Sequence, residues 1–226
     1  MTGQGSARPT GTFAPTVHRP FPATPMDLGE TMRLGAPQRG LPDVVNDWRS
    51  DNRRHLRRGL RTVETARRLH IPTMYGRLFL RVLHPDGRTT SLGLASLRVV
   101  TDVGVAAIVD AFTNTFELET FNFHGIGTGV AAEAVTDTAL GIESTTALNP
   151  DSTRATGVQS QPSANIYRTV GTVSVDAAVA VTEHGLFNQA ATGGGVLLDR
   201  SVFAVINLAA GGGLEGTYDL TVNAGG

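Results

Sequence analysis

The sequence contains no cysteine and no lysine, so all 19 of its basic residues are arginine. Without cysteine the chain has no disulfide, no thiol nucleophile and no zinc or iron–sulfur site built on thiolates. Without lysine it has no Schiff-base chemistry, no pyridoxal anchor and no phosphate-loop lysine. These absences exclude several large classes of enzyme. The exclusive use of arginine is itself typical of a very GC-rich genome.

Long apolar runs and targeting signals are also missing. No stretch reaches the ~18 apolar residues that a transmembrane helix needs. The N-terminus lacks the charged start and apolar run of a signal peptide. The nucleophile-elbow pattern G-x-S-x-G is absent, and none of the 6 histidines has metal-ligand spacing. The sequence therefore predicts no membrane contact, no metal, no cofactor and no catalytic residue. It also predicts a chain that is made in a cytoplasm and stays soluble unless it leaves inside a larger particle.

The net charge of −1 conceals two oppositely charged halves. Residues 1–100 contain 16 arginines and 7 acidic residues, a net charge of +9. Residues 101–226 contain 3 arginines and 13 acidic residues, a net charge of −10. Such an asymmetry indicates two parts of the chain with different roles.

Residues 1–40 are rich in proline and glycine, and their apolar residues are isolated from one another. This composition cannot bury enough apolar surface to fold alone, so one interpretation is a disordered tail. We favour the other interpretation, an extended arm that lies across a neighbouring subunit. Its expected anchors are Phe13, Phe21 and Leu28.

Residues 41–72 form the second segment and have the pattern of an amphipathic helix. Pro42 and Asp43 suit a helix start, and Pro72 ends the pattern. An N-cap signal at Ser50-Asp51-Asn52 favours two helices with a break there over one. The apolar side, at 100° per residue, consists of Val45, Trp48, Leu56, Leu60 and Val63. The basic side consists of Arg53, Arg54, Arg57, Arg58, Arg61 and Arg68.

The basic side of this helix has three interpretations. It is a solvated face, a contact for nucleic-acid phosphates, or a docking surface for protein carboxylates. Residues 49–68 have no interleaved aromatics and no helix-turn-helix pattern, which argues against sequence-specific DNA recognition. We favour the docking surface, because arginine is enriched at interfaces. The acidic half of a neighbouring copy is one natural partner.

From residue 73 onward, the hydrophobic period changes from 3.6 to 2. Pro85-Asp86-Gly87 predicts a hairpin turn, and Thr101-Asp102 predicts the cap of a short helix. We expect further strands at 116–124 and near 153–160, 164–175, 178–187, 196–208 and 215–223, and a second helix cap at Thr136-Asp137. Residues 73–226 therefore predict a mainly β fold, a β-sandwich or jelly-roll-like domain with one or two short helices.

Three local patterns in this domain suggest chemistry, and each also has a structural explanation that we favour. Gly125-x-Gly127-x-Gly129 resembles a phosphate cradle, but it lacks the dinucleotide spacing and a lysine. Glu183-His184 could form an acid/base couple. In Asp199-Arg200, neighbouring strand residues point to opposite faces, so we expect Arg200 to meet an acid at a subunit contact or to extend to the surface.

Five segments resemble a recurrent pattern in structural proteins of tailed bacteriophages. The resemblance covers roughly residues 75–226 and implies a virion β-domain without catalytic residues. It does not extend to residues 1–70. The segments are Phe123-His124-Gly125-Ile126-Gly127-Thr128-Gly129, Thr136-Asp137-Thr138-Ala139-Leu140, Ala164-Asn165-Ile166-Tyr167-Arg168-Thr169-Val170, Thr182-Glu183-His184-Gly185-Leu186-Phe187 and Leu197-Leu198-Asp199-Arg200-Ser201-Val202-Phe203.

The expected function is therefore that of a non-enzymatic virion protein, specifically a capsid decoration (cement) protein. Its arm and arginine-rich helix would staple neighbouring capsid subunits. Its expected partners are the major capsid protein or other virion subunits, and further copies of itself in a homo-oligomer. The alternative is a tail, head–tail junction or fibre component, with contact to the host receptor. Nucleic acid is a less favoured partner.

Overall fold

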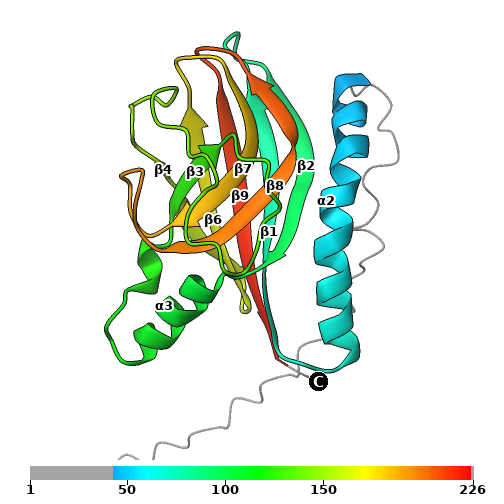
Figure 1. Ribbon diagram of the computed structural model, residues 1–226, viewed down its shortest axis with the longest axis vertical. Coiled ribbons are helices and arrows are strands. Elements are labelled where there is room, and N and C mark those ends of the chain that lie inside the picture. The colour runs from blue at the N-terminus through cyan, green and yellow to red at the C-terminus, as the bar shows by residue number, and fades with distance from the viewer. Residues whose placement is uncertain (1–42, 225–226) are drawn as a thin grey trace, which may run out of the picture. The chain divides into compact units, whose positions relative to one another are not determined.

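The computed structural model describes residues 43–224, which contain two antiparallel sheets and a long helix beside them (Figure 1). The expectation of a mainly β chain is confirmed. The arm, with Phe13, Phe21 and Leu28, lies outside the described residues. The helices are α2 (Asp43–Arg68), α3 (Asp102–Phe112) and the 3-10 helix η1 (Leu118–Thr120). The strands are β1 (Thr73–Leu83), β2 (Thr89–Val99), β3 (Phe123–Gly127), β4 (Ala155–Thr156), β5 (Val158–Ser163), β6 (Ile166–Ser174), β7 (Val179–Phe187), β8 (Leu197–Leu208) and β9 (Gly213–Asn223).

The two sheets differ in size and connection. The five-stranded sheet has the order β2-β1-β9-β6-β5, and the four-stranded sheet has the order β4-β3-β7-β8. The N-terminal hairpin of the five-stranded sheet turns where the sequence predicts it, with Gly87 at a φ of 82°. This positive φ is open to glycine at no steric cost. Strand β1 also pairs with β9 along its whole length, from Thr73 to Leu83, so the last strand of the chain lies in the middle of the sheet.

The core lies between the two sheets. Leu80 of β1 and Leu214 of β9 face it from the five-stranded sheet, and Val181 of β7 and Phe203 of β8 face it from the four-stranded sheet. Each of these side chains is almost fully buried. Burying one such side chain stabilises the fold by about 1.5–3 kcal/mol. The period of 2 in the sequence is thus the pattern of strands with one buried face.

Helix α2 covers the side of the sandwich where the edge strands β2 and β8 approach each other (Figure 1). The side-chain amide of Asn52 donates to the Ala95 carbonyl of β2 at 2.8 Å and accepts from the Ala204 N–H of β8 at 3.0 Å. Trp48 Nε1 donates to the Ala204 carbonyl at 2.8 Å. The helix therefore supplies hydrogen-bond partners to both edge strands, which otherwise leave backbone groups unpaired.

The expected break at Ser50-Asp51-Asn52 is wrong, because α2 runs through these residues as one helix. Asn52 is fully buried, and its side-chain amide forms hydrogen bonds with β2 and β8 instead of capping a new helix. The expected apolar side is confirmed: Val45, Trp48, Leu56 and Val63 are buried and Leu60 is half-buried.

Two further expectations in the β-domain are wrong. The strand expected at 116–124 is replaced by η1 and by β3, which begins only at Phe123. Here Phe116 packs against Phe121 with 5.1 Å between ring centroids, so the chain turns instead of extending. Thr136-Asp137 caps no helix, because the Asp137 carboxylate accepts from the Ala134 N–H at 2.8 Å within a turn.

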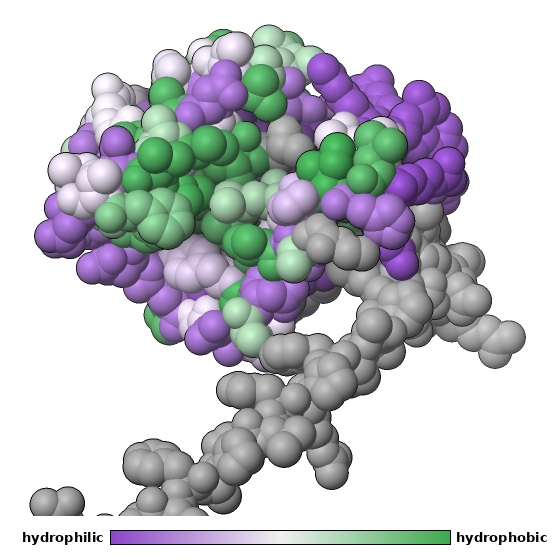
Figure 2. All heavy atoms as spheres, turned by 90° about the horizontal axis from the view of Figure 1, so that it is seen from below, coloured by the Kyte–Doolittle hydropathy of each residue, from purple (hydrophilic) through white to green (hydrophobic). Residues whose placement is uncertain are grey.

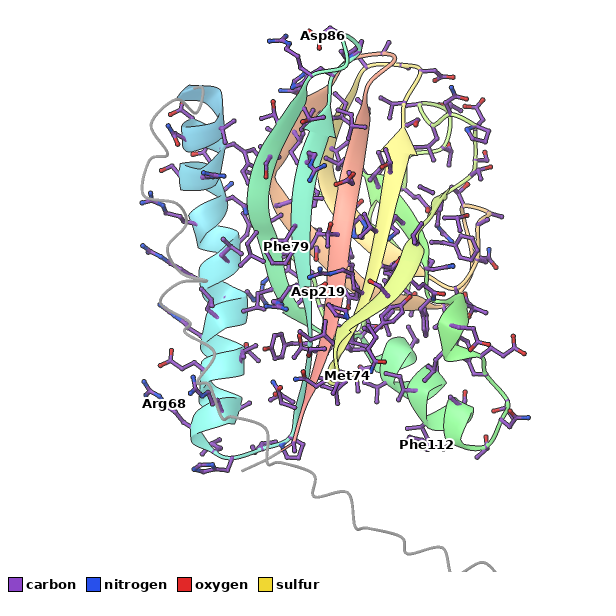
Figure 3. All side chains as sticks on the ribbon, turned by 180° about the vertical axis from the view of Figure 1, so that it is seen from behind. Arg68, Met74, Phe79, Asp86, Phe112 and Asp219 are labelled. Atoms are coloured by element: carbon purple, nitrogen blue, oxygen red, sulfur yellow. The ribbon has the colours of Figure 1, made fainter. Side chains whose placement is uncertain are left out.

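Helix α3 forms as the sequence predicts, and the Thr101 side chain caps it by accepting from the Gly104 N–H. Its buried residues, however, are the small Gly104 and Ala107. The larger Val105, Val109 and Phe112 are exposed, Phe112 to 87%. The short helix therefore presents apolar side chains outward at one end of the sandwich (Figure 3).

Candidate functional site

The outer face of α2 carries a row of arginines. Arg53, Arg57 and Arg61 follow one another at every fourth residue, so they share one ridge of the helix. Arg54 and Arg58 lie beside that ridge. All five side chains are exposed and line one depression of the surface. The five are called the arginine face below.

Within residues 43–224, the arginine face has no carboxylate partner. Arg54 Nε lies 3.3 Å from His55 Nε2, which is a contact between neighbours in the chain. The structure thus brings together five of the six helix arginines that the sequence singles out. The sixth, Arg68, lies in the last turn and forms an ion pair with Glu64 at 2.6 Å.

The arginines of the β-domain are arranged differently, because every one of them in the described chain contacts a carboxylate. Asp219, on β9, receives two of them, Arg77 at 3.0 Å and Arg168 at 2.6 Å (Figure 3). The remaining pairs are Arg81–Glu215, Arg88–Asp86, Arg98–Glu133, Arg154–Glu143 and Arg200 with both Asp137 and Glu183.

Glu183, on β7, is the centre of the most enclosed of these networks. Its fully buried carboxylate accepts from the backbone N–H groups of Gly129, Gly141 and Ile142 at 2.8–2.9 Å. Arg200 Nε donates to it at 2.8 Å from β8. Burial alone would raise the pKa of Glu183, but these hydrogen bonds outweigh it and hold the pKa below its ordinary value. The network ties the loop 128–142 to the four-stranded sheet.

Arg200 completes that network from within the chain. Its guanidinium also donates to Asp137 at 2.9 Å, and its side chain is only 4% exposed. The expectation that Arg200 meets a subunit contact or extends to the surface is therefore wrong. The glycines of Gly125-x-Gly127-x-Gly129 likewise form no phosphate cradle. The first two belong to β3, and the Gly129 N–H is bonded to Glu183.

Glu183 and His184 do not form an acid/base couple, because neighbouring strand residues point to opposite faces. His184 points between the sheets, where its Nε2 lies 3.0 Å from His124 Nδ1. His124 Nε2 contacts the Thr169 hydroxyl at 3.2 Å across the core. Burial lowers the pKa of His124 to about 3, and burial and the neighbouring His124 lower the pKa of His184. Both imidazoles are neutral and closed off from solvent.

Asp199 is a buried acid whose environment the sequence did not indicate. It lies on the opposite face of β8 from Arg200, and burial raises its pKa to about 7. Its oxygens accept from the hydroxyls of Ser201 at 3.2 Å and Tyr218 at 3.3 Å. With an exposure of 2%, the carboxyl group has no path to a substrate.

Five segments of the β-domain, residues 123–129, 136–140, 164–170, 182–187 and 197–203, meet in these buried networks. His124, Thr169 and His184 come from three segments and join the two sheets. Asp137 and Arg200 come from the other two and contact each other, and Arg200 also contacts Glu183. These residues therefore hold strands and loops together.

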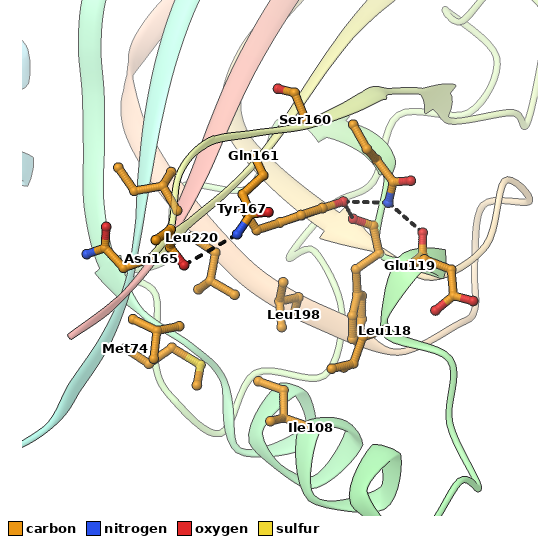
Figure 4. A pocket seen from close by; sticks show the side chains of 15 residues that line it. Met74, Ile108, Leu118, Glu119, Ser160, Gln161, Asn165, Tyr167, Leu198 and Leu220 are labelled. Carbon is orange, nitrogen blue, oxygen red and sulfur yellow. Dashed lines mark hydrogen bonds between the residues drawn. The ribbon is translucent and has the colours of Figure 1, made fainter. Parts of the chain in front are cut away.

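An apolar pocket opens at the end of the sandwich next to α3 (Figures 2 and 4). Its volume is about 610 Å³. Met74, Ile108, Leu118, Tyr167, Leu198 and Leu220 form much of its wall. Little in the sequence indicates this pocket, because its walls come from elements far apart in the chain. The one available signal was the number of large apolar residues on α3.

Within residues 43–224, no three acidic or histidine side chains gather as a metal ion requires. No helix in that range combines the length and apolar character needed to cross a bilayer. No family model, no curated protein and no solved structure matches the chain.

Proposed function

We propose that the protein is a non-enzymatic structural component of a tailed-bacteriophage virion, and that it decorates the capsid by stapling neighbouring capsid subunits. The observation that carries the proposal is the contrast between the arginine face and the arginines of the β-domain. Each arginine in residues 73–224 pairs with a carboxylate of the chain. On α2 the chain displays five without a carboxylate partner in residues 43–224.

The chemistry of this face suits an acidic protein surface. A guanidinium binds a carboxylate through two parallel hydrogen bonds, and five in a row match a row of acidic side chains. Trp48 and Asn52 fix α2 to both sheets, so the row is held in place before binding and loses little conformational entropy. Contacts of modest strength, repeated over symmetric copies, give a large total affinity.

The β-domain supports the same proposal. Its ionised and polar buried groups close internal networks, which keep the strands and the loop 128–142 in one arrangement. A displayed capsid protein needs such a rigid body more than it needs an open reactive site. The resemblance to virion proteins rests on the residues of these same networks.

Binding to capsid shells that lack the protein tests the proposal. The variant Arg57→Gln/Arg61→Gln removes two charges from the arginine face. The matched control Arg81→Gln/Arg88→Gln removes two exposed charges from the sandwich, where the side chains are 52% and 79% exposed. We expect the helix variant to bind at least about tenfold more weakly and the control to bind as the unchanged protein does. Equal affinities for all three proteins would overturn the proposal.

The same row of guanidiniums also favours nucleic acid as a second candidate partner. Exposed arginines at every fourth residue give the electrostatic footprint of a phosphate-binding helix. Titrating the same variants with random duplex DNA at several salt concentrations separates the two. Tight, salt-dependent DNA binding that the helix variant loses, without binding to shells, would favour nucleic acid. Counting the copies of the protein per virion tests where in the virion it lies. Hundreds of copies would fit decoration of the capsid, whereas tens would fit a tail, head–tail junction or fibre.

A further inference from the structure

The pocket beside α3 has the chemistry of a peptide-binding groove. Apolar side chains line its floor, and Phe121 and Tyr167 add aromatic surface. A volume of about 610 Å³ accommodates a large side chain together with adjoining residues. Phe112 and Val109 of α3 are exposed, as is Val222 of β9, which lines the pocket. Figure 2 shows apolar surface at this end of the molecule. Exposed apolar surface of this kind, rimmed by polar groups, marks interaction sites.

The rim of the pocket offers hydrogen-bond donors to a bound chain. Gln161 Nε2 donates to the Ala164 carbonyl at 3.3 Å (Figure 4). Asn165 Nδ2 donates to Asn223 at 3.0 Å. Each carboxamide has two N–H groups, so each has a further donor to offer. These donors suit a proline-rich segment, which presents carbonyl oxygens but few backbone N–H groups.

We infer that this pocket binds residues 18–28 of a second copy of the chain, with Phe21 as the anchor. The inference deepens the proposed function, since it assigns a receptor to the arm. Phe21 stands between Pro20 and Pro22, and Pro25 follows. Prolines restrict the segment to extended conformations before it binds, which lowers the entropy lost on docking into an aromatic-lined groove.

Charge complementarity supports residues 18–28 as the segment that binds the pocket. The end of the sandwich between residues 102 and 120 contains four acidic residues and no arginine. All four are exposed, and Glu119 belongs to the wall of the pocket. In the arm, Arg19 is two residues from Phe21. Two residues of extended chain span ~7 Å, so Arg19 reaches a carboxylate at the rim while Phe21 fills the pocket.

The length of the arm is sufficient to join two copies. Phe21 precedes the start of α2 at Asp43 by 22 residues, which span up to roughly 75 Å when extended. Helix α2 starts at the end of the sandwich opposite the pocket (Figure 1). Donor segment and pocket are different surfaces, so the contact is heterologous, and repeated copies close into a ring when the rotation between them permits.

Photo-crosslinking of the full chain tests the inference. Leu118 is replaced by the photoreactive p-benzoylphenylalanine, and this protein is mixed with isotopically heavy chain before irradiation. We expect crosslinked peptides that join position 118 of one isotope to residues 18–28 of the other. The matched control carries the same photoreactive residue at Val130, which is 78% exposed and is not part of the pocket. The control should not capture residues 18–28.

Two variants of the arm complete the experiment. Phe21→Ala should lower the crosslink yield at position 118 by about tenfold, because it removes a buried aromatic anchor. Leu34→Ala, at an apolar residue outside residues 18–28, should leave the yield unchanged. Equal losses for both variants, crosslinks confined to a single isotope, capture of other segments or no crosslink would each overturn the inference. The purified chain is used without capsid shells. This experiment can therefore contradict the inference about the pocket while the shell-binding experiment supports the proposed function, and the reverse.

Discussion

Helix α2 and the β-sandwich use the same cation in opposite ways. The sandwich places Arg154 and Arg200 at 1% and 4% side-chain exposure and surrounds each with carboxylates and carbonyl oxygens. The helix leaves Arg53, Arg57 and Arg61 in solvent, without a carboxylate partner in residues 43–224. Moving an ion out of water is costly, so a buried guanidinium must be paired in the native state. An exposed guanidinium is stable unpaired and is available to a partner.

The comparison separates residues that hold the fold from residues that are free to bind. Arg154 illustrates the first kind, because it pairs with Glu143 through two hydrogen bonds and stacks over the Phe187 ring at 3.4 Å. Such a residue cannot change partner without unfolding its surroundings. The side chains of Arg57 and Arg61 form no ion pair and no hydrogen bond within residues 43–224, so replacing them removes neither kind of contact.

Replacing Arg200 by Met should cause the largest loss of stability. It leaves Glu183 buried and charged opposite an uncharged side chain, which costs about 3–5 kcal/mol. Urea unfolding followed by circular dichroism measures the loss. The matched control is Arg57→Met on α2, which should change the unfolding free energy by less than about 0.5 kcal/mol. Similar values for the two variants would remove the distinction between the two regions.

Acid should destabilise the sandwich through its buried histidines. Burial lowers the pKa of His124 to about 3, whereas an unfolded histidine has a pKa of about 6.5. Between these values the unfolded chain binds more protons, so stability is full above the unfolded pKa and falls as the pH drops. The expected loss from His124 alone approaches about 4 kcal/mol near pH 3.

Asp199 has the opposite pH dependence. Burial raises its pKa to about 7, so the stability that its neutral form contributes is lost as the pH rises toward that value. Measurements in the Asp199→Asn variant therefore remove this opposing contribution. Nuclear magnetic resonance gives the direct readout: the imidazole signals of His124 and His184 should not shift with pH until the chain unfolds. A gradual shift in the folded state near pH 6.5 would contradict the prediction.

Replacing Asn52 by Ala should have an intermediate effect. The change leaves the Ala95 carbonyl of β2 and the Ala204 N–H of β8 without their partner, at a cost of about 1–3 kcal/mol. Thermal unfolding measures it, and Asp51→Ala, an exposed neighbour, serves as the control. Because Asn52 links α2 to both sheets, hydrogen exchange of α2 amides should also accelerate. An Asn52→Ala protein as stable as the control would show that the two hydrogen bonds of Asn52 contribute little to holding the helix.

Removing charges from the arginine face should have the smallest effect on stability. The Arg57→Gln/Arg61→Gln variant should unfold within about 0.5 kcal/mol of the unchanged chain, because neither side chain has an ion pair in the described residues. A small gain in the free energy of unfolding would also agree with this prediction, because like charges four residues apart repel by a few tenths of a kcal/mol. A loss of more than about 1 kcal/mol would show that these arginines contribute to the fold.

Much of the fold follows from periodicity. The change of period at residue 73 coincides with the start of β1 at Thr73, and the Gly87 turn and the Thr101 cap lie where local chemistry puts them. The failures are local patterns that long-range contacts override. Asn52 has the residue type of a helix cap but bonds to two strands more than 40 residues away. In residues 116–124, where we expected a strand, Phe116 packs on Phe121 and the chain turns between them.

The sequence by itself determined the class of fold, the separation of a basic segment from an acidic body, and the exposed row of arginines on α2. These depend on spacing and charge, which are local properties of a chain. Only the tertiary structure decided that Glu183 pairs with Arg200, that His184 faces His124, and that an apolar pocket lies beside α3. Each of these joins residues from different strands and loops, and which residues meet depends on how the two sheets pair and pack.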